Sequence, residues 1–130
     1  MRKRTKILLI IFVVIALLTA FGIYMINRIN QEMEVLTISE IPEINLVQID
    51  DGTYSGSFKS LLIKVQVEVT IQNHVITDII ILEHQNGQGD DADVIIDDVL
   101  LEQSINIDFI SGATYSSKAI LLAIGDALTN

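Results

Sequence analysis

An uncharged apolar run near the amino terminus constrains this chain more than any other feature. Residues Ile7 to Ile26 are twenty residues without a charge, and as an α-helix they would rise about 30 Å, the thickness of a bilayer core. The alternative is a cleaved signal peptide, with a mediocre cleavage site at Leu18-Thr19-Ala20. The run exceeds the roughly 7–15 apolar residues usual in such signals, which favours an uncleaved transmembrane anchor.

Basic residues immediately before this run predict its orientation. Four of the eight basic residues precede it: Arg2, Lys3, Arg4 and Lys6. Such a cluster is held on the cytoplasmic side during insertion, so we expect everything after Arg28 to be extracytoplasmic. The predicted organisation is a cytoplasmic basic segment (1–6), a single-pass anchor in the cell membrane (7–26), an extracytoplasmic tether (27–49) and a folded domain (50–130).

The extracytoplasmic part is strongly acidic. From Asn27 to Asn130 it holds four basic residues against all seventeen acids, a formal charge of −13. Such a surface repels phosphate backbones, so we expect no nucleic-acid partner. Solubility explains most of this charge.

The residue types available for metal binding are few. Cysteine is absent, which removes disulfides, thiolate zinc sites and iron–sulfur ligation. The histidines, His74 and His84, are too few for a three-histidine zinc site. The acids Asp90, Asp91, Asp93, Asp97 and Asp98 lack the spacing of a calcium loop and are typical of a helix N-terminus with a solvated face. We therefore expect no metal.

Strand patterns dominate the middle of the chain. Asp51-Gly52 is a turn signal that leads into a short strand at 53–55. In residues 61–73 apolar and polar side chains alternate, which places one face on a core. The apolar members are Ile63, Val65, Val67, Val69 and Ile71. Asn73-His74 suits a tight hairpin to the next apolar run, 75–84, so the pattern predicts an antiparallel sheet of about three strands.

Two amphipathic segments can cover this sheet as helices, which makes the predicted fold class α+β. Residues 91–104 place these side chains on one face: Ala92, Ile95, Ile96, Val99 and Leu100. Residues 116–130 form a stripe of Ile120, Ala123, Ile124, Ala127 and Leu128. The segment 27–47 shows no clean period and Pro42 forbids a continuous helix across it, so we expect a tether with a docked strand or turn.

The loop between the two predicted helices carries the candidate functional residues. Gly112 and Ala113 let the backbone approach a bound group, and Ser116 or Ser117 can cap the helix beyond. A helix N-terminus favours phosphate, and Thr114 would stand at its mouth. No histidine lies nearby in sequence to activate this hydroxyl, so its presentation for modification by another enzyme is favoured over self-catalysed hydrolysis.

These loop residues also carry a family resemblance. Asp108, Ser111, Gly112, Ala113 and Thr114 reproduce the pattern D-x-x-[ST]-G-A-T, in which the chain resembles the FMN-binding domain family. That family includes covalently flavinylated subunits of sodium-pumping NADH:quinone reductases and Rnf-type complexes. The resemblance covers about 50–130, with the family's usual order of segments: DGTYSG, VEVTIQNHVITDIIILEH, NGQG, EQS and SGATYSSKAI.

One segment departs from the pattern of larger family members. Those members often read H-x-E-T-P-G-x-G after the central hairpin, whereas residues 84–89 read HQNGQG, without the acid and the proline. The chain is therefore more similar to the short membrane-anchored branch than to a pump subunit. Gly87 and Gly89 are interpreted as turn residues, with approach to the flavin as the minority interpretation.

The resemblance implies a covalent cofactor. In that family a flavin transferase moves FMN from FAD onto the threonine, which forms a phosphoester and releases AMP. On this chain the acceptor would be Thr114, and the transferase would recognise Asp108, Ser111, Gly112 and Ala113. The flavin ring is expected at the apolar sheet edge.

Tyr115, Ser116, Ser117 and His84 complete the predicted cofactor site. For Tyr115, for His84 and for the nearby Lys118, a structural alternative stands beside the cofactor role. Tyr115 would stack on the ring or pack against the core, and His84 would hydrogen-bond a flavin edge or face solvent. Ser116 and Ser117 are the predicted helix caps. Lys118 would neutralise the phosphate, although a solvated lysine is the default for a helix of this kind.

These features predict an electron carrier and not a stand-alone enzyme. The expected partners are the flavin transferase and a quinone- or flavin-linked redox partner in the membrane, with an external electron acceptor. The alternative from a different class is an anchored interaction or sensory module with the same fold that is never flavinylated. Non-covalent FMN is a third possibility.

Overall fold

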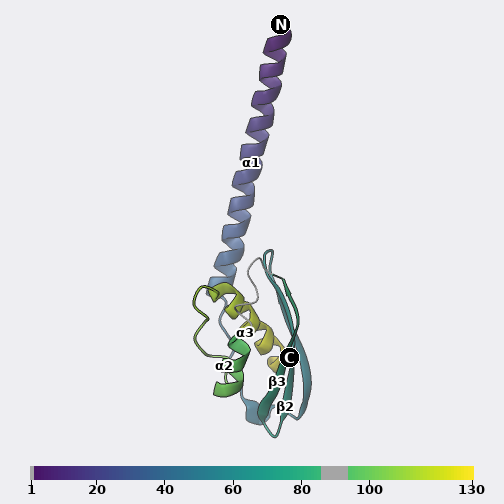
Figure 1. The fold of residues 1–130 in the computed structure, drawn as a ribbon, viewed down its shortest axis with the longest axis vertical. Helices are drawn as coiled ribbons and strands as arrows, with labels where there is room; N and C mark the ends of the chain where they lie inside the picture. Colours follow the sequence, from purple (N-terminus) through teal and green to yellow (C-terminus); the bar gives the residue numbers. More distant parts are fainter. Residues whose placement is uncertain (1, 86–93) are drawn as a thin grey trace.

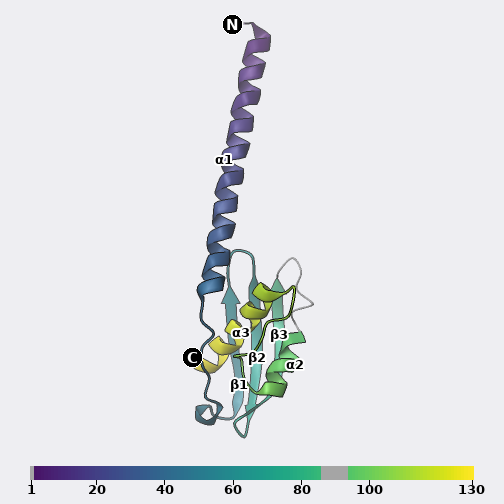
Figure 2. The same cartoon turned by 90° about the vertical axis from the view of Figure 1, so that its left-hand side faces the viewer.

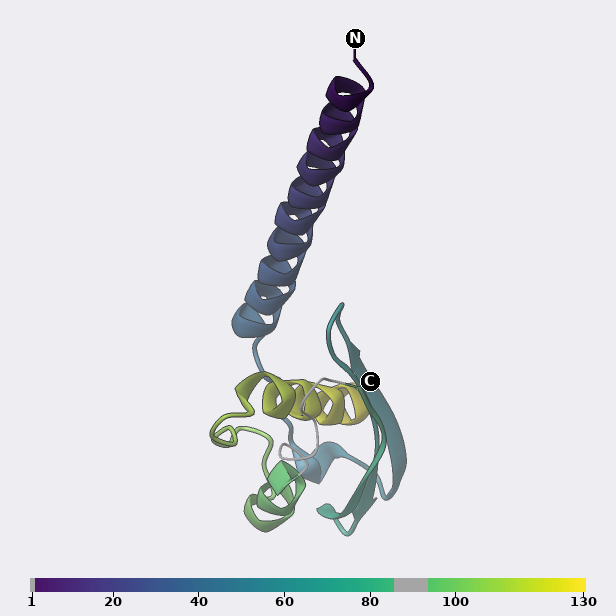
Figure 3. The same ribbon diagram turned by 45° about the horizontal axis from the view of Figure 1, so that its top comes forward.

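A computed structural model describes residues 2–85 and 94–130 (Figure 1). Along the described chain the elements are α1 (Lys3–Ile38), the 3₁₀-helix η1 (Leu46–Gln48), β1 (Gly52–Lys59), β2 (Lys64–Gln72), β3 (Val75–Gln85), α2 (Ile95–Glu102) and α3 (Thr114–Thr129). The strands form one antiparallel sheet in the order β1-β2-β3. Helices α2 and α3 lie on one face of this sheet (Figure 3). The predicted α+β class is confirmed.

Helix α1 projects away from the rest of the fold (Figures 1 and 2). It is long and apolar enough to cross a membrane, and none of its most apolar window is buried against the domain. A core helix of a soluble protein would be mostly buried, so the exposed apolar side chains of α1 are consistent with a membrane anchor.

The same helix continues beyond the apolar run, where a tether with a strand or turn was expected. It ends at Ile38, four residues before Pro42, and only then does the chain become extended. Leu36 in the last turns is 1% exposed and belongs to the core of the domain. The end of α1 is therefore packed against the domain, although its sequence has no amphipathic period.

The sheet follows the predicted alternation. On β2 the apolar side chains are all buried: Ile63 just before the strand, then Val65, Val67, Val69 and Ile71. Asn73 and His74 have φ values of 52° and 62°, the left-handed conformation at both positions that a two-residue hairpin turn requires. The predicted hairpin is confirmed.

Strand β3 departs from simple alternation at two points. The pairing with β2 shifts between Gln66 and Val67 and again between Thr70 and Ile71, so β3 carries an extra residue at each point. The second shift leaves Thr77 as the extra residue and so allows Ile76 and Ile79, three residues apart, to be buried on the same face. Strand β3 therefore has eleven residues where β2 has nine.

Helix α3 supplies most of the cover for the sheet. All five residues of its predicted apolar stripe are buried: Ile120, Ala123, Ile124, Ala127 and Leu128. The helix crosses β1 at Gly56, where a Cβ atom would overlap the carbonyl oxygen of Ala123 and the backbone nitrogen of Ala127. The carboxylate of Asp126 accepts a hydrogen bond of 2.9 Å from the backbone N–H of Ser57 beside this crossing.

Helix α2 packs against the other edge of the sheet. Ile95 and Val99 are buried as predicted, Ile96 and Leu100 are half-buried, and the predicted Ala92 lies outside the described residues. Gln103 ends the helix in the left-handed conformation, with φ of 52°. Its side-chain amide accepts from the backbone N–H of Ile76 at 2.7 Å and donates to the carbonyl of Ile76 at 2.9 Å, so it pairs with β3 as a strand residue would.

Candidate functional site

A tight turn precedes helix α3 and fixes the loop that carries the motif. The backbone N–H of Ala113 donates to the carbonyl of Ile110 at 3.0 Å, and Gly112 has φ of +79° at the third position of this turn. That conformation favours glycine. A Cβ atom on Gly112 would meet nothing within 4 Å, so backbone conformation and not crowding selects glycine here.

Helix α3 begins at Thr114, at least three residues earlier than the predicted caps would place its start. Ser116 and Ser117 lie inside the first turn and are buried, so the prediction that either caps the helix is wrong. The hydroxyl of Ser117 instead accepts a hydrogen bond of 3.1 Å from the backbone N–H of Ile110, which holds the loop against the helix. Ala113 takes the N-cap position, and its methyl side chain cannot accept a hydrogen bond. No N-cap side chain therefore covers the N-terminus of α3 beside Thr114.

Thr114 is accessible at this helix N-terminus. Its side chain is exposed, as are Ser111 and Gly112 before it, whereas Ala113 is half-buried. The first-turn amides of a helix have no intrahelical acceptors, and the positive end of the dipole adds to their attraction for an anion. An external enzyme can therefore reach the Thr114 hydroxyl, and the amides beside it favour phosphate.

A hollow of about 300 Å³ adjoins Thr114, lined by Thr37, Phe109, Thr114, Tyr115 and Lys118. Tyr115 is 41% exposed and Phe109 is 39% exposed, so both rings are available to a flat ligand. None of the lining residues comes from the sheet. The aromatic side chains available beside Thr114 therefore belong to the loop and to α3, while the expected position of the ring at the sheet edge remains a prediction.

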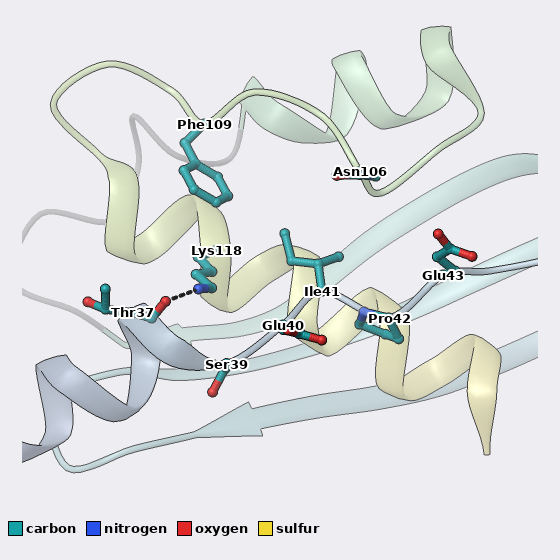
Figure 4. Close-up of a pocket in the computed structure, with 9 residues that line it drawn as sticks. All are labelled: Thr37, Ser39, Glu40, Ile41, Pro42, Glu43, Asn106, Phe109 and Lys118. Atoms are coloured by element: carbon teal, nitrogen blue, oxygen red, sulfur yellow. Dashed lines mark hydrogen bonds between the residues drawn. The ribbon is translucent and has the colours of Figure 1, made fainter.

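Lys118 occupies an unexpected environment. Its side chain is 9% exposed, and its Nζ atom donates a hydrogen bond of 2.7 Å to the backbone carbonyl of Thr37 in the last turn of α1 (Figure 4). The default interpretation as a solvated lysine is therefore wrong. Thr114 and Lys118 are four positions apart in the sequence, which places them on the same face of α3. A cation thus lies beside the candidate acceptor hydroxyl.

A larger hollow continues from the first where α1 meets the domain. Its volume is about 790 Å³, and it shares Thr37, Phe109 and Lys118 with the smaller one. The remaining lining residues are Ser39, Glu40, Ile41, Pro42, Glu43 and Asn106 (Figure 4). Sequence reasoning missed Thr37 and Phe109: Phe109 stands inside the motif loop, where an apolar aromatic residue was a usable signal, but nothing in the sequence pointed to Thr37.

Asp108 and His84 lie outside both of these hollows. Asp108 is exposed and lines a separate depression with Asp98, Glu102, Asn106 and Ile107. His84 is half-buried near the end of β3, where it pairs in register with Val65. The roles predicted for these two residues, in transferase recognition and at a flavin edge, stay predictions.

The acidic residues of α2 form no recognisable metal centre. Asp97 and Asp98 are in the first turn of the helix, where carboxylates complement the dipole. Within residues 2–85 and 94–130 no three or more acidic or histidine side chains converge as metal ligands would. Asp90, Asp91 and Asp93, like Gly87 and Gly89, lie outside the described residues.

These features define a small α+β domain at the end of a long apolar helix, with an exposed threonine at a helix N-terminus beside a buried cation and two aromatic rings. The sequence profile of the FMN-binding domain matches residues 62–129, slightly more than half of the chain. The chain therefore belongs to the FMN-binding domain family. Searches among curated proteins and among solved structures gave no match.

Proposed function

We propose that the protein carries FMN covalently, as a phosphoester between the flavin phosphate and the Oγ1 atom of Thr114. The observation that carries this proposal is the exposed Thr114 hydroxyl at the open N-terminus of α3, within a domain of the FMN-binding family. Gly112 supports it, because its left-handed backbone conformation, which favours glycine, sets the turn that leads into the helix at Thr114.

The residues around Thr114 fit such a group. The amides of the first turn of α3 and the Lys118 ammonium would hold the phosphate, and Phe109 and Tyr115 would contact the ring. Bound FMN would supply the reversible uptake and release of electrons. The contribution of the protein is attachment, orientation and the charge that surrounds the cofactor.

The second part of the proposal is electron transfer at a membrane. The apolar helix α1 would anchor the domain, and the basic residues before it favour a cytoplasmic N-terminus with the domain outside. The domain would then pass electrons between a quinone- or flavin-linked partner in the membrane and an external acceptor. A flavin transferase that uses FAD as donor would load it, with AMP as the leaving group.

Intact mass tests the covalent attachment. The full-length chain would be expressed with an active flavin transferase, purified in detergent and denatured before analysis, with peptide mapping across Ile107 to Ile120. We expect a mass increase equal to FMN less one water, located on Thr114. Thr114→Val should fold and remain unmodified, because it is nearly isosteric but lacks the hydroxyl, whereas Thr114→Ser keeps an acceptor oxygen and should be modified.

Two results would contradict the proposal. An unmodified mass, from cells whose transferase modifies a control protein, would favour an anchored module without flavin. Flavin that remains with the folded protein but is lost on denaturation would mean non-covalent binding. For the electron-transfer part, the flavin absorbance of the loaded protein in membranes should bleach when a quinol-generating substrate is added, and Thr114→Val membranes should show no such change.

A further inference from the structure

The connection between β1 and β2 exposes two large apolar side chains that the core does not use. We call residues Ser60 to Leu62 the hairpin tip. Leu61 and Leu62 are 49% and 41% exposed, whereas the next residue, Ile63, is 6% exposed and belongs to the core. Burial thus accounts for Ile63 but not for the two leucines before it.

Hydrogen bonds within the tip hold these leucines outward. The backbone N–H of Ser60 donates to the carbonyl of Ile63 at 2.8 Å, which closes the turn. The hydroxyl of Ser60 accepts from the backbone N–H groups of Leu62 at 3.4 Å and Ile63 at 3.2 Å. The tip is therefore a closed loop that exposes two leucine side chains.

A further hydrogen bond sets the position of the tip relative to α1. The backbone N–H of Leu61 donates to the Oε2 atom of Glu32 at 3.1 Å. Glu32 follows the end of the apolar run, Ile26, by six residues, or about 9 Å along the helix axis. Figure 2 shows the β1–β2 connection reaching up beside α1 toward its N-terminus, while the Asn73-His74 turn lies at the far end of the sheet. The leucines therefore lie near the level at which α1 would leave a bilayer.

The charges around the tip also fit a lipid surface. Lys59 and Lys64 flank it. They are two of the four basic residues between Asn27 and Asn130, the part of the chain with a formal charge of −13. Lys64 also forms an ion pair of 2.6 Å with Glu83, and the Glu32 carboxylate accepts the hydrogen bond from the backbone N–H of Leu61. Among the described residues, the charged groups next to the tip are thus Glu32 on α1, Lys59 on β1 and the Lys64–Glu83 pair on β2 and β3, two of each sign. This balance differs from the acidic excess of the region as a whole, which anionic lipid head groups would repel.

From this placement we infer that the hairpin tip inserts Leu61 and Leu62 into the head-group layer of the membrane that α1 spans. The head-group layer adds about 5–8 Å on each side of the hydrocarbon core. The level of Glu32, about 9 Å along α1 from Ile26, is at the outer edge of this layer. With α1 as one attachment and the tip as a second, the domain would hold one fixed orientation on the membrane. The Thr114 site would then lie beside the end of α1. The inference rests on the membrane anchoring in the proposed function but not on flavin attachment.

Site-directed fluorescence tests this inference directly, because the chain has no native cysteine. Three single-cysteine variants of the full-length protein would carry an environment-sensitive nitrobenzoxadiazole label: Leu62→Cys at the tip, Ile26→Cys in the apolar run and Val75→Cys as the control. Val75 is 44% exposed, close to the 41% of Leu62, but β2 separates the two by about 30 Å. Each would be reconstituted into phosphatidylcholine and phosphatidylglycerol vesicles that contain a head-group spin-labelled lipid as quencher.

We expect a blue-shifted emission and strong quenching at Leu62→Cys, and neither at Val75→Cys. Quenching at Ile26→Cys with none at Leu62→Cys would overturn the inference while leaving the anchor intact. An unquenched Ile26→Cys label would overturn the anchor, and the tip insertion with it. A blue shift at Leu62→Cys without lipid quenching would mean that the tip contacts protein instead of lipid, which also contradicts the inference.

Discussion

The Nζ atom of Lys118 donates a hydrogen bond of 2.7 Å to the backbone carbonyl of Thr37, a residue 81 positions earlier in the chain. Thr37 lies in the last turn of α1, where backbone carbonyls have no intrahelical donor and where a cation also complements the helix dipole. Lys118 therefore caps the end of the long helix from inside the domain. Since Lys118 also lies one turn from Thr114, the end of α1 and the proposed flavin site share one cation.

Substitution of this lysine should weaken the junction. We expect Lys118→Met to lower the free energy of unfolding by about 1.5–3 kcal/mol, the range for a hydrogen bond that involves a charged group. It should also lower the fraction of chains that carry flavin. Denaturant unfolding in detergent and intact mass measure the two effects. Thr37→Val is the matched control, because it removes only the hydroxyl that donates to the Met33 carbonyl and keeps the backbone acceptor; an equal loss in both variants would argue against the cap.

The turn before α3 should respond to backbone conformation and not to side-chain size. Gly112 has φ of +79°, so we expect Gly112→Ala to cost about 1–2 kcal/mol of stability and to reduce flavin loading. Gly112→Asn is larger but tolerates this conformation better and should cost less. Thermal unfolding and intact mass check the order of the two variants. The interpretation fails if asparagine is as damaging as alanine.

Among the glycines that the structure describes, Gly56, at the crossing of α3 over β1, should tolerate a side chain least. In Gly56→Ala the new methyl group would overlap backbone atoms of Ala123 and Ala127, so helix and strand must separate. We expect a loss of about 1–3 kcal/mol or more, typical of overpacking. Gly52→Ala on the same strand is the control, because its Cβ would meet only the Tyr54 ring at an ordinary 3.7 Å. Similar unfolding midpoints for the two variants would contradict this account.

The pairing of Gln103 with β3 should matter for the position of α2. Gln103→Leu removes both hydrogen bonds to the Ile76 backbone and the one donated to the Leu100 carbonyl at 2.8 Å. We expect a loss of about 1–3 kcal/mol, because part-buried backbone groups lose their partners. Hydrogen exchange at the Ile76 amide should accelerate. Gln72→Leu, at an exposed position at the end of β2, should leave that exchange rate unchanged.

Local patterns were sufficient to predict the elements of the fold. The alternation from Ile63 to Ile71 predicted a strand with one buried face, and Asn73-His74 predicted the turn that follows it. The stripe from Ile120 to Leu128 predicted the buried face of α3. Each of these signals spans a few residues, and in each the backbone geometry alone decides which side chains share a face.

The failures of prediction involve contacts that a local pattern does not show. The end of α1 was expected to be a tether. Its contacts are made by Leu36, Glu32 and Thr37 with residues later in the chain. Ser117 was expected to cap α3, but its partner is Ile110, on the far side of a turn whose geometry Gly112 sets. The two bulges of β3 appear only in its pairing with β2.

The sequence by itself determined the apolar helix, the hairpin, the apolar stripe of α3 and the motif around Thr114, because each is written in neighbouring residues. Only the tertiary structure decided that Lys118 is buried against Thr37, that Phe109 and Tyr115 line one hollow with Thr114, and that Leu61 lies beside Glu32. These relationships depend on how helices and strands pack, and packing is set by the summed burial of many side chains and not by any local pattern.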